Sequence, residues 1–440
     1  MILRATFRNI LSFKEETSIS FVAGKSTHHA SHVVRAAGRD DISVLKAGVI
    51  YGANASGKSN IIKAVQILKN IALGQLPKSN IEPFKLSEER QPVSKLEIEF
   101  KTAGRYFAYG VEFSVNGIDE EWLFDINART DKEVFSRKSG KDGNTFTFGT
   151  VNGNKETTQF LKFLADGTPS NTSFLSEYVR RNGRGLDLIK EAFAWFKDKL
   201  NILFPNSRYQ GISFNVERNR DFQDGTRKLL DFFDTGIKDI RRMEIKKEEI
   251  DIPSELQERL IAKLEPGRTV AITSESGSQT FFIDMGIDGT LSYYKQKTVH
   301  TNDAGREVVF EEDEESDGSI RLMDFIPMLI DLKQNDDVFL IDEIDRSLHP
   351  LLSQKLLEYF FSMLTESRST QLIFTTHEAS LLDLKTLRAD EVWFAEKDKS
   401  GATHLTSLAE YKPREDVRRG YLLGRYGAIP FFPSIKSLNW

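Results

Sequence analysis

Residues 52–59 carry the pattern that most restricts how this chain can fold. They read Gly-Ala-Asn-Ala-Ser-Gly-Lys-Ser, which fits the sequence G-x-x-x-x-G-K-[ST]. Residues 46–51 predict a short buried strand directly before this loop, and apolar side chains recur at helical spacing from Ile61 to Ala72 directly after it. A glycine loop between a strand and a helix is the setting in which this pattern binds nucleotide phosphates.

The residue types in this loop suit a phosphate chain and a magnesium ion. The glycines allow backbone N–H groups to surround phosphates at a helix N-terminus, where the helix dipole also favours an anion. Lys58 adds a positive charge toward the β- and γ-phosphates, and the Ser59 hydroxyl can take one coordination position of Mg²⁺. The expected nucleotide contacts are Gly52, Asn54, Ser56, Gly57, Lys58, Ser59 and Asn60.

A second apolar strand ends in two adjacent carboxylates. Residues 338–341 are all apolar, and Asp342 and Glu343 follow them directly. We expect Asp342 to hold Mg²⁺ through its water shell and Glu343 to point toward the attacking water. Taken alone, the segment also fits an ordinary buried strand that ends in a polar turn. In a chain that contains a phosphate loop, the catalytic interpretation is favoured.

Two further segments are candidates for the same site. His377 ends the next predicted strand, and strand ends are where such sheets present ligand-contacting groups. A lone histidine at that position is more often structural. Ser316 and Gly318 open a helix that follows the acidic run 311–315. On their own they indicate only a helix N-cap.

The order of the elements predicts an α/β fold with a mostly parallel core sheet. Strands at 46–51, 337–341 and 371–375 alternate with helices, which is typical of parallel sheets. Other segments of period two predict an antiparallel strand pair and a meander with a hairpin at Asn116-Gly117. These segments are Ile2–Phe7, Thr17–Phe21, Leu96–Phe100, Tyr106–Val115 and Trp122–Ile126.

Three ranges divide the chain in this interpretation. Residues 1–150 form a lobe with the phosphate loop and the antiparallel strands. Residues 151–305 form an inserted lobe of mixed polar helices, for example Leu186–Leu203 and Ser254–Leu264. Residues 306–440 carry the remaining candidate segments and a C-terminal tail.

Composition and charge exclude several classes of protein. The chain contains no cysteine, so it has neither disulfides nor thiolate metal sites, and its histidines show no paired ligand spacing except His28 and His29, which are expected in a loop. We therefore predict no structural metal. Residues 1–21 lack a signal-peptide pattern and no apolar run is long enough to span a membrane, which predicts a cytoplasmic protein without a membrane partner. The net charge of −5 argues mildly against a dedicated DNA-binding protein, although Arg180–Arg184 is locally basic.

Together the four segments resemble the ABC-type P-loop ATPases of the RecF and SMC type, since phosphate loop, signature, Asp-Glu strand and switch histidine follow in that family's order. The resemblance implies an ABC-type split head that binds ATP and Mg²⁺. It further implies that Ser316 and Gly318 bind the γ-phosphate held by a second subunit, that Asp345 contacts the dimer partner, and that His377 is the switch histidine.

The chain is most similar to stand-alone bacterial AAA-type, OLD-like ATPases of two-gene phage-defence and abortive-infection systems. The similar stretches are Phe7–Ile10, Pro83–Leu86, Phe113–Trp122, Asp234–Asp239, Glu315–Ser319, Ile341–Pro350 and Tyr421–Pro430. No unmistakable Q-loop glutamine appears in the sequence, and Ser173–Ser176 is only a positional candidate for that loop. Because no acidic cluster of a Toprim nuclease follows His377, the resemblance implies a separate effector.

The resemblance thus implies an ATP hydrolase that dimerises on nucleotide and controls a partner effector, such as a nuclease. A RecF-like DNA-repair ATPase that clamps DNA is the alternative. A third interpretation keeps ATP as a static ligand and leaves Glu343 nearly idle, and slow turnover with tight ATP retention would favour it. A transporter motor is the weakest interpretation, because nothing in the sequence indicates a membrane partner.

Overall fold

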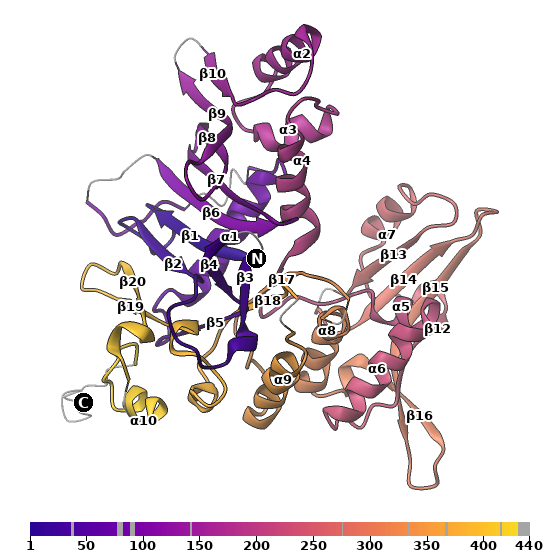
Figure 1. The fold of residues 1–440 in the computed structure, drawn as a ribbon. Helices are drawn as coiled ribbons and strands as arrows, with labels where there is room; N and C mark the ends of the chain where they lie inside the picture. Colours follow the sequence, from indigo (N-terminus) through magenta and orange to yellow (C-terminus); the bar gives the residue numbers. More distant parts are fainter. Residues whose placement is uncertain are drawn as a thin grey trace. The chain divides into compact units, whose positions relative to one another are not determined.

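The computed structural model groups the chain into two compact units. It describes residues 1–36, 39–76, 82–88, 93–140, 143–274, 276–332, 334–365, 368–413 and 416–429. The first unit comprises Met1–Pro205, Asp336–Ile344 and Phe361–Trp440, and the second comprises Asn206–Asn335 and Asp345–Phe360. The elements of both units are labelled in Figure 1.

The first unit contains a seven-stranded antiparallel sheet in the order β10-β9-β8-β7-β6-β1-β2. Its strands are β1 (Ile2–Arg8), β2 (Thr17–Ser20), β6 (Ser94–Thr102), β7 (Arg105–Ser114), β8 (Gly117–Asp125), β9 (Lys132–Gly140) and β10 (Gly143–Phe148). The predicted N-terminal strand pair and meander are therefore confirmed. Gly117 has a φ of 140° at the start of β8, so the β7–β8 turn uses a backbone region that glycine tolerates.

A second sheet of the first unit has the order β11-β17-β18-β5-β19-β20. Its strands are β5 (Ala47–Tyr51), β11 (Leu200–Leu203), β17 (Val338–Ile341), β18 (Gln371–Thr375), β19 (Val392–Lys397) and β20 (Thr403–Ser407). All neighbours pair in parallel except β19 and β20. The prediction of a mostly parallel core sheet is confirmed. In addition, β3 (Val33–Ala36) and β4 (Arg39–Leu45) form a separate hairpin.

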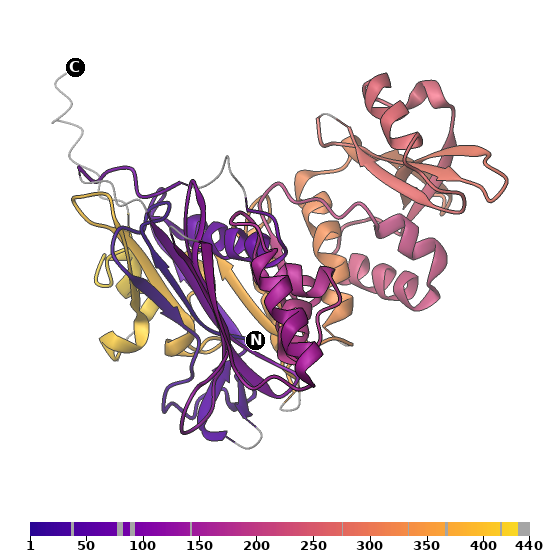
Figure 2. The same cartoon turned by 90° about the horizontal axis from the view of Figure 1, so that it is seen from above.

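Helix α1 (Lys58–Ala72) contributes to one continuous apolar core with both large sheets of the first unit. This core contains Ile61, Val65 and Leu68 of α1 together with side chains of β1, β6, β7, β5, β17 and β18. Figure 2 shows the same ribbon from above. The other helices of this unit are α2 (Lys155–Asp166), α3 (Phe174–Arg180), α4 (Asp187–Ala194) with its π-helical extension η2 (Trp195–Lys199), and α10 (Val417–Leu422). Its 3₁₀ turns are η1 (Ala30–His32), η5 (Ala379–Leu381), η6 (Ala389–Glu391) and η7 (Leu408–Tyr411).

The second unit combines helices with an antiparallel sheet of order β12-β15-β14-β13, to which β16 adds beside β15. The strands are β12 (Asp239–Ile245), β13 (Thr269–Thr273), β14 (Thr280–Met285), β15 (Leu291–Thr301) and β16 (Glu307–Glu311). The helices are α5 (Ile212–Arg218), α6 (Arg220–Phe232), α7 (Ser254–Ile261), α8 (Asp317–Asp331) and α9 (Pro350–Ser362), with the 3₁₀ turns η3 (Lys247–Glu249) and η4 (Glu312–Glu314).

Three expectations for the inserted region differ from the structure. The region was expected to be mainly helical, but it contains the antiparallel sheet. The predicted helix Leu186–Leu203 ends at Lys199, and Leu200–Leu203 form β11, because these residues complete the edge of the parallel sheet beside β17. Helix α7 also ends at Ile261, earlier than the predicted Leu264.

The predicted division of the sequence into residues 1–150, 151–305 and 306–440 remains a prediction. The grouping by contacts is different: residues 151–205 lie in the first unit, and residues 306–335 lie in the second. Since β11 pairs with β17, the chain completes an edge of the first unit's core sheet before it enters the second unit. Among the described residues, no helix is long and apolar enough to cross a membrane.

Candidate functional site

The phosphate-loop segment lies where the sequence pattern predicts it, between β5 and α1. Gly57 is the N-cap residue of α1 with a φ of 104°, and no side chain caps the helix. Lys58 is buried, and its Nζ donates to the carbonyl oxygens of Gly52 at 2.7 Å and Ala53 at 3.0 Å. A cation beside a helix N-terminus without a side-chain cap fits an anionic phosphate group.

The other loop residues differ in their surroundings. Asn54 is exposed, whereas Ser56 is buried and its Oγ has no hydrogen-bond partner among the described residues. A buried hydroxyl without a partner fits a loop that receives a polar ligand. Ser59 is half-buried in the first turn of α1. The Asn60 side chain donates from Nδ2 to Ser12 Oγ at 2.8 Å, so its predicted nucleotide contact stays a prediction.

The two predicted acidic residues follow β17 at the same edge of the parallel sheet. Asp342 is buried, and its Oδ1 accepts a hydrogen bond from Thr375 Oγ1 at 2.7 Å. Glu343 has a φ of 50°, and its backbone N–H donates to the same Thr375 hydroxyl at 2.8 Å. A left-handed backbone at a residue other than glycine is strained and is held by its surroundings. Thr375 therefore orients both acidic residues, although the sequence interpretation did not single it out.

His377 connects this acidic edge with the phosphate loop. Its Nδ1 lies 3.5 Å from Lys58 Nζ, and its Nε2 lies 4.0 Å from Glu343 Oε1. The side chains of His377 and Glu343 are each about one-third exposed, so both can be reached from solvent. The structure thus brings Lys58, His377, Asp342 and Glu343 to one edge of a single sheet, in the segments that follow β5, β18 and β17.

Ser316, Gly318 and Asp345 belong to the second unit. Ser316 is the N-cap of α8, and its Oγ accepts a hydrogen bond from Ser319 N at 3.1 Å. A Cβ on Gly318 would lie 2.9 Å from the Ser347 carbonyl oxygen, so only glycine fits there without a shift. Both residues line a cavity of about 610 Å³ inside this unit, together with Asp234, Thr235 and His349. Asp345 Oδ1 is buried and has no hydrogen-bond partner among the described residues.

The positional Q-loop candidate Ser173–Ser176 is wrong. Ser173 Oγ bonds to the carbonyl oxygen of Ala72, which lies at the far end of α1 from the phosphate loop. An α-helix rises about 1.5 Å per residue, so the length of α1 separates this segment from Lys58 by roughly 20 Å. Ser173 instead caps α3.

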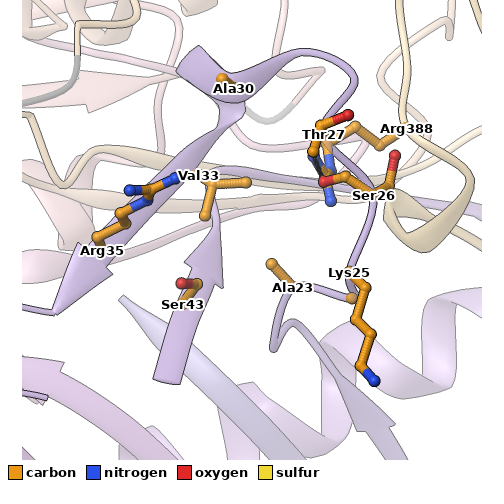
Figure 3. A pocket seen from close by; sticks show the side chains of 10 residues that line it. Ala23, Lys25, Ser26, Thr27, Ala30, Val33, Arg35, Ser43 and Arg388 are labelled. Atoms are coloured by element: carbon orange, nitrogen blue, oxygen red, sulfur yellow. Dashed lines mark hydrogen bonds between the residues drawn. The ribbon is translucent and has the colours of Figure 1, made fainter. Parts of the chain in front are cut away.

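Another cavity of the first unit, of about 460 Å³, contains none of the predicted site residues. It lies beside the β3–β4 hairpin, with Lys25, Arg35 and Arg388 among its lining residues. Arg388 is already engaged, because its guanidinium donates to both carboxylate oxygens of Asp390. Lys25 extends away from the other lining residues, whereas Arg35 extends toward Val33 (Figure 3). These cations do not converge on one point, so the cavity is not a second phosphate site.

Comparison with known protein families shows which family this chain belongs to. Residues 49–383 match a family model described as "AAA domain, putative AbiEii toxin, Type IV TA system". The chain belongs to this family. The match begins in β5 and ends after His377, so it includes the phosphate loop, the acidic strand and the histidine. The predicted relationship to AAA-type ATPases of abortive-infection systems is confirmed, and the chain is a P-loop ATPase by family and fold. Its fold class is the predicted one, a P-loop α/β head whose two sheet-forming halves are separated by an inserted unit.

Three solved structures of SMC head domains are similar to this chain. The SMC head bound to the C-terminal winged-helix domain of ScpA has a TM-score of 0.43 and 14% identity, and the similarity covers 93% of this chain and 99% of that chain. The Thermotoga maritima SMC head has a TM-score of 0.38 and 13% identity, covering 92% and 98%. The Pyrococcus furiosus SMC head with an extended coiled coil and the C-terminal domain of ScpA has a TM-score of 0.41 and 14% identity, covering 97% and 98%. No curated protein matches the chain significantly by sequence.

Proposed function

We propose that this protein binds ATP with Mg²⁺, dimerises on nucleotide, and uses hydrolysis to control a separate effector in phage defence. The observation that carries the proposal is the row of side chains from Lys58 through His377 to Glu343. In-line attack of water on a γ-phosphate requires a phosphate-binding cation and a group that positions the water. This row supplies both at one sheet edge.

In this proposal the phosphate loop binds the β- and γ-phosphates of ATP. Lys58 Nζ exchanges its bonds to the loop carbonyl oxygens for bonds to phosphate oxygens, and the first turn of α1 donates N–H groups. Ser59 and Asp342 are the residues that would hold magnesium. When bound, the ion supplies positive charge that neutralises the phosphate oxygens.

Glu343 is the proposed general base. Its carboxylate accepts a proton from the attacking water, while the Thr375 hydroxyl fixes the backbone of Glu343 and the orientation of Asp342. His377 lies between Lys58 and Glu343 and would donate to the γ-phosphate from one ring nitrogen. The Glu343 backbone and the Asp342 carboxylate are held by Thr375 before substrate arrives, so they require little reorganisation at the moment of reaction.

We further propose that the second unit completes the site of another copy of the chain. Ser316 and Gly318 line an open cavity at the start of α8, where a γ-phosphate held by a partner's Lys58 could dock. Asp345 would contact that partner. The resulting homodimer has two composite sites, each with a phosphate loop from one chain and a signature segment from the other.

The family description supports a role with a second gene product. It names a putative toxin and a toxin–antitoxin system, and such systems pair two proteins. We propose that the partner of this chain is an effector such as a nuclease, and that both act in the cytoplasm. Co-expression with the neighbouring reading frame tests this proposal. Co-purification that depends on Lys58 would support it, and a neighbour that never co-purifies under ATP would contradict it.

Substitution of Glu343 by glutamine tests the catalytic assignment. Glu343→Gln keeps the shape of the side chain and removes the base, so ATP should bind normally while the hydrolysis rate falls about 100-fold or more. Glu378→Gln is the matched control, because its carboxylate only accepts a hydrogen bond from Ser380 N. Hydrolysis by Glu343→Gln at the rate of this control would assign the base to another residue.

A further inference from the structure

Two hydroxyl side chains from distant parts of the sequence meet behind the phosphate loop. Ser12 follows β1 near the start of the sequence, and Thr403 is the first residue of β20 near its end. Both are buried, with 6% and 1% of their surface exposed. The Thr403 hydroxyl lies 2.7 Å from Ser12 Oγ and 2.9 Å from the carbonyl oxygen of Ser56, which is part of the loop. The backbone N–H of Thr403 also donates to the Ser12 carbonyl oxygen at 2.8 Å.

The Thr403 hydroxyl is the donor of both of its contacts in this network. It donates to Ser12 Oγ and to the carbonyl oxygen of Ser56, which share its one proton. Ser12 Oγ in turn accepts from Asn60 Nδ2 at 2.8 Å. This series of hydrogen bonds therefore begins at Asn60 on α1, passes through Ser12 and Thr403, and ends at Ser56 in the loop. The two buried hydroxyls thus connect the first turn of α1 with the loop.

Gly57 shows how closely this anchor approaches the loop. A Cβ on Gly57 would lie 2.1 Å from Thr403 Oγ1 and 2.8 Å from Ser12 Oγ. The loop backbone thus rests directly on the two hydroxyls, with the left-handed φ of 104° that glycine permits. The backbone N–H groups that open α1 point in the direction set by this turn.

We propose that Ser12 and Thr403 are positioning residues that set the phosphate-binding conformation of the loop. Their hydroxyls hold the Ser56–Gly57 peptide so that the N–H groups of the loop face the nucleotide, and neither needs to touch the nucleotide. The inference rests on the proposed ATP-binding function of this loop. It adds that β20 and the segment after β1, which lack any recognisable nucleotide motif, determine the affinity of the site.

The test compares three substitutions on β20 and the β1 segment by ATP titration of the purified full-length chain. Thr403→Val removes the hydroxyl and keeps the shape, Thr403→Ser keeps the hydroxyl, and Ser12→Ala removes the second member of the network. Thr406→Val is the matched control. It makes the same change on the same strand, three residues later, where the side chain lies on the opposite face of the sheet. Thermal melting of each nucleotide-free variant reports folding separately.

Thr403→Val should bind ATP about tenfold more weakly, the equivalent of one buried hydrogen bond at about 1.4 kcal/mol. Thr403→Ser should restore affinity to within about twofold of wild type, and Thr406→Val should leave it unchanged. Ser12→Ala combined with Thr403→Val should weaken binding by less than the product of the single effects, because both act through one network. Amide hydrogen exchange should rise at residues 56–60 in Thr403→Val and not in Thr406→Val.

Wild-type ATP affinity in both Thr403→Val and Ser12→Ala would overturn the proposal, even if their melting temperatures fall. Should Thr403→Val fail to fold, Thr403→Ser and Ser12→Ala still decide it by the same titration. Lys58→Ala separates this outcome from failure of the proposed function. If Lys58→Ala also binds ATP like wild type, the loop is not the nucleotide site, and the proposed function fails instead.

Discussion

At the residue scale, the site depends on a few side chains whose partners are fixed. Lys58, His377 and Glu343 follow one another within 4.0 Å at the edge of the parallel sheet. Thr375 supports this row from the neighbouring strand, because its hydroxyl bonds both to the Asp342 carboxylate and to Glu343 N. The chemistry assigned to each residue can therefore be tested by single substitutions.

Lys58→Ala should lose tight ATP binding while the protein remains folded. The lysine is the cation of the phosphate loop whose Nζ lies among the loop carbonyl oxygens, and without it the phosphate charge is not compensated. We expect affinity to fall about 100-fold, measured by nucleotide titration, with an unchanged circular dichroism spectrum. Unchanged affinity would contradict the assignment of this loop.

Thr375→Val should lower hydrolysis more than binding. The substitution leaves Asp342 without its hydroxyl partner and frees the strained backbone of Glu343, so both acidic groups lose their orientation. We expect kcat to fall about 10- to 100-fold with ATP affinity changed less than about threefold. Thr376→Val is the control, since its hydroxyl bonds to Glu378 N. Equal loss of kcat in both variants would mean that Thr375 has no special role.

The residues named by motif could be predicted because their spacing is local. Gly52 to Ser59 and the Asp342-Glu343 pair each follow a short apolar strand, which the sequence shows directly. Thr375, Ser12 and Thr403 carry no such signal. Ser12 and Thr403 are 391 residues apart in sequence and meet only because β1 and β20 pack near the loop. Their roles follow from tertiary contacts, which no local pattern contains.

At the element scale, α10 and the residues that follow it pack against β19 and against the end of β5, the strand that leads into the phosphate loop. Tyr421 and Tyr426 stack on Phe394 of β19 with ring centroids 5.7 Å and 5.5 Å apart, and Tyr421 lies 5.6 Å from Tyr51, the last residue of β5. Sequence similarity had singled out Tyr421–Pro430 without a structural role. Pro430 lies outside the described residues.

Tyr421→Ala should therefore destabilise the first unit. Removing a buried aromatic ring typically costs about 3–5 kcal/mol, and Tyr421 is only 6% exposed. The expected result is a clear loss in the free energy of unfolding measured by urea denaturation. Leu422→Ala, one residue later and 58% exposed, should change it by less than about 0.5 kcal/mol. Similar losses in both variants would argue against the stacked arrangement.

Helix α8 contains a buried carboxyl group that makes stability depend on pH. Burial raises the pKa of Asp324 from 3.8 to about 6, although Tyr209 N and Arg208 oppose the shift. The folded state therefore holds the proton more tightly than the unfolded state. Asp324 contributes stability below pH 4 that is lost as the pH rises through about 6.

Asp324→Asn should remove this dependence. The amide keeps an acceptor for Tyr209 N and carries no charge, so the variant should gain stability relative to wild type between pH 4 and pH 7, by on the order of 1–3 kcal/mol. Urea denaturation of both proteins at several pH values measures the difference in their free energy of unfolding. The contributions of the other carboxyl groups cancel in this difference. A difference that stays constant over this range would contradict the buried acid.

The antiparallel sheet of the second unit shows where prediction from sequence failed. Strands β12 and β15 pair across more than 45 residues of intervening chain, and charged residues such as Arg241 and Lys297 interrupt their apolar alternation. Without a clear period of two, the sequence indicated polar helices instead. By contrast, the N-terminal meander alternates regularly and has short turns, so its strands could be predicted.

At the scale of the whole molecule, the predicted site residues are divided between the two units. The phosphate loop, Asp342, Glu343 and His377 lie in the first unit, and Ser316, Gly318 and Asp345 lie in the second. The chain crosses from one unit to the other directly after Ile344, two residues beyond Asp342. We propose that the second group completes the site of a partner chain, so that a dimer would be the active form.

Mixing two inactive variants tests this shared site. Lys58→Ala removes nucleotide binding on one chain, and Ser316→Arg places a bulky cation where the partner's γ-phosphate should dock. In a heterodimer of the two, both defects can fall in one composite site, which leaves the other intact. Recovery of ATP hydrolysis on mixing would support sites shared between chains. If closure requires two nucleotides, the mixture stays inactive, so only recovery is decisive.

The most direct test of the central claim is the hydrolysis rate of Ser316→Arg alone. Its own phosphate loop is unchanged, so we expect normal ATP binding together with the loss of nucleotide-dependent dimerisation and of hydrolysis. Ser316 also caps α8, and losing a cap costs about 1 kcal/mol. Asn219→Arg, which removes the N-cap of α6 in the same unit, controls for that loss and should hydrolyse ATP normally. Hydrolysis by Ser316→Arg at the wild-type rate would show that this segment is only a helix cap and that the site is not shared between chains.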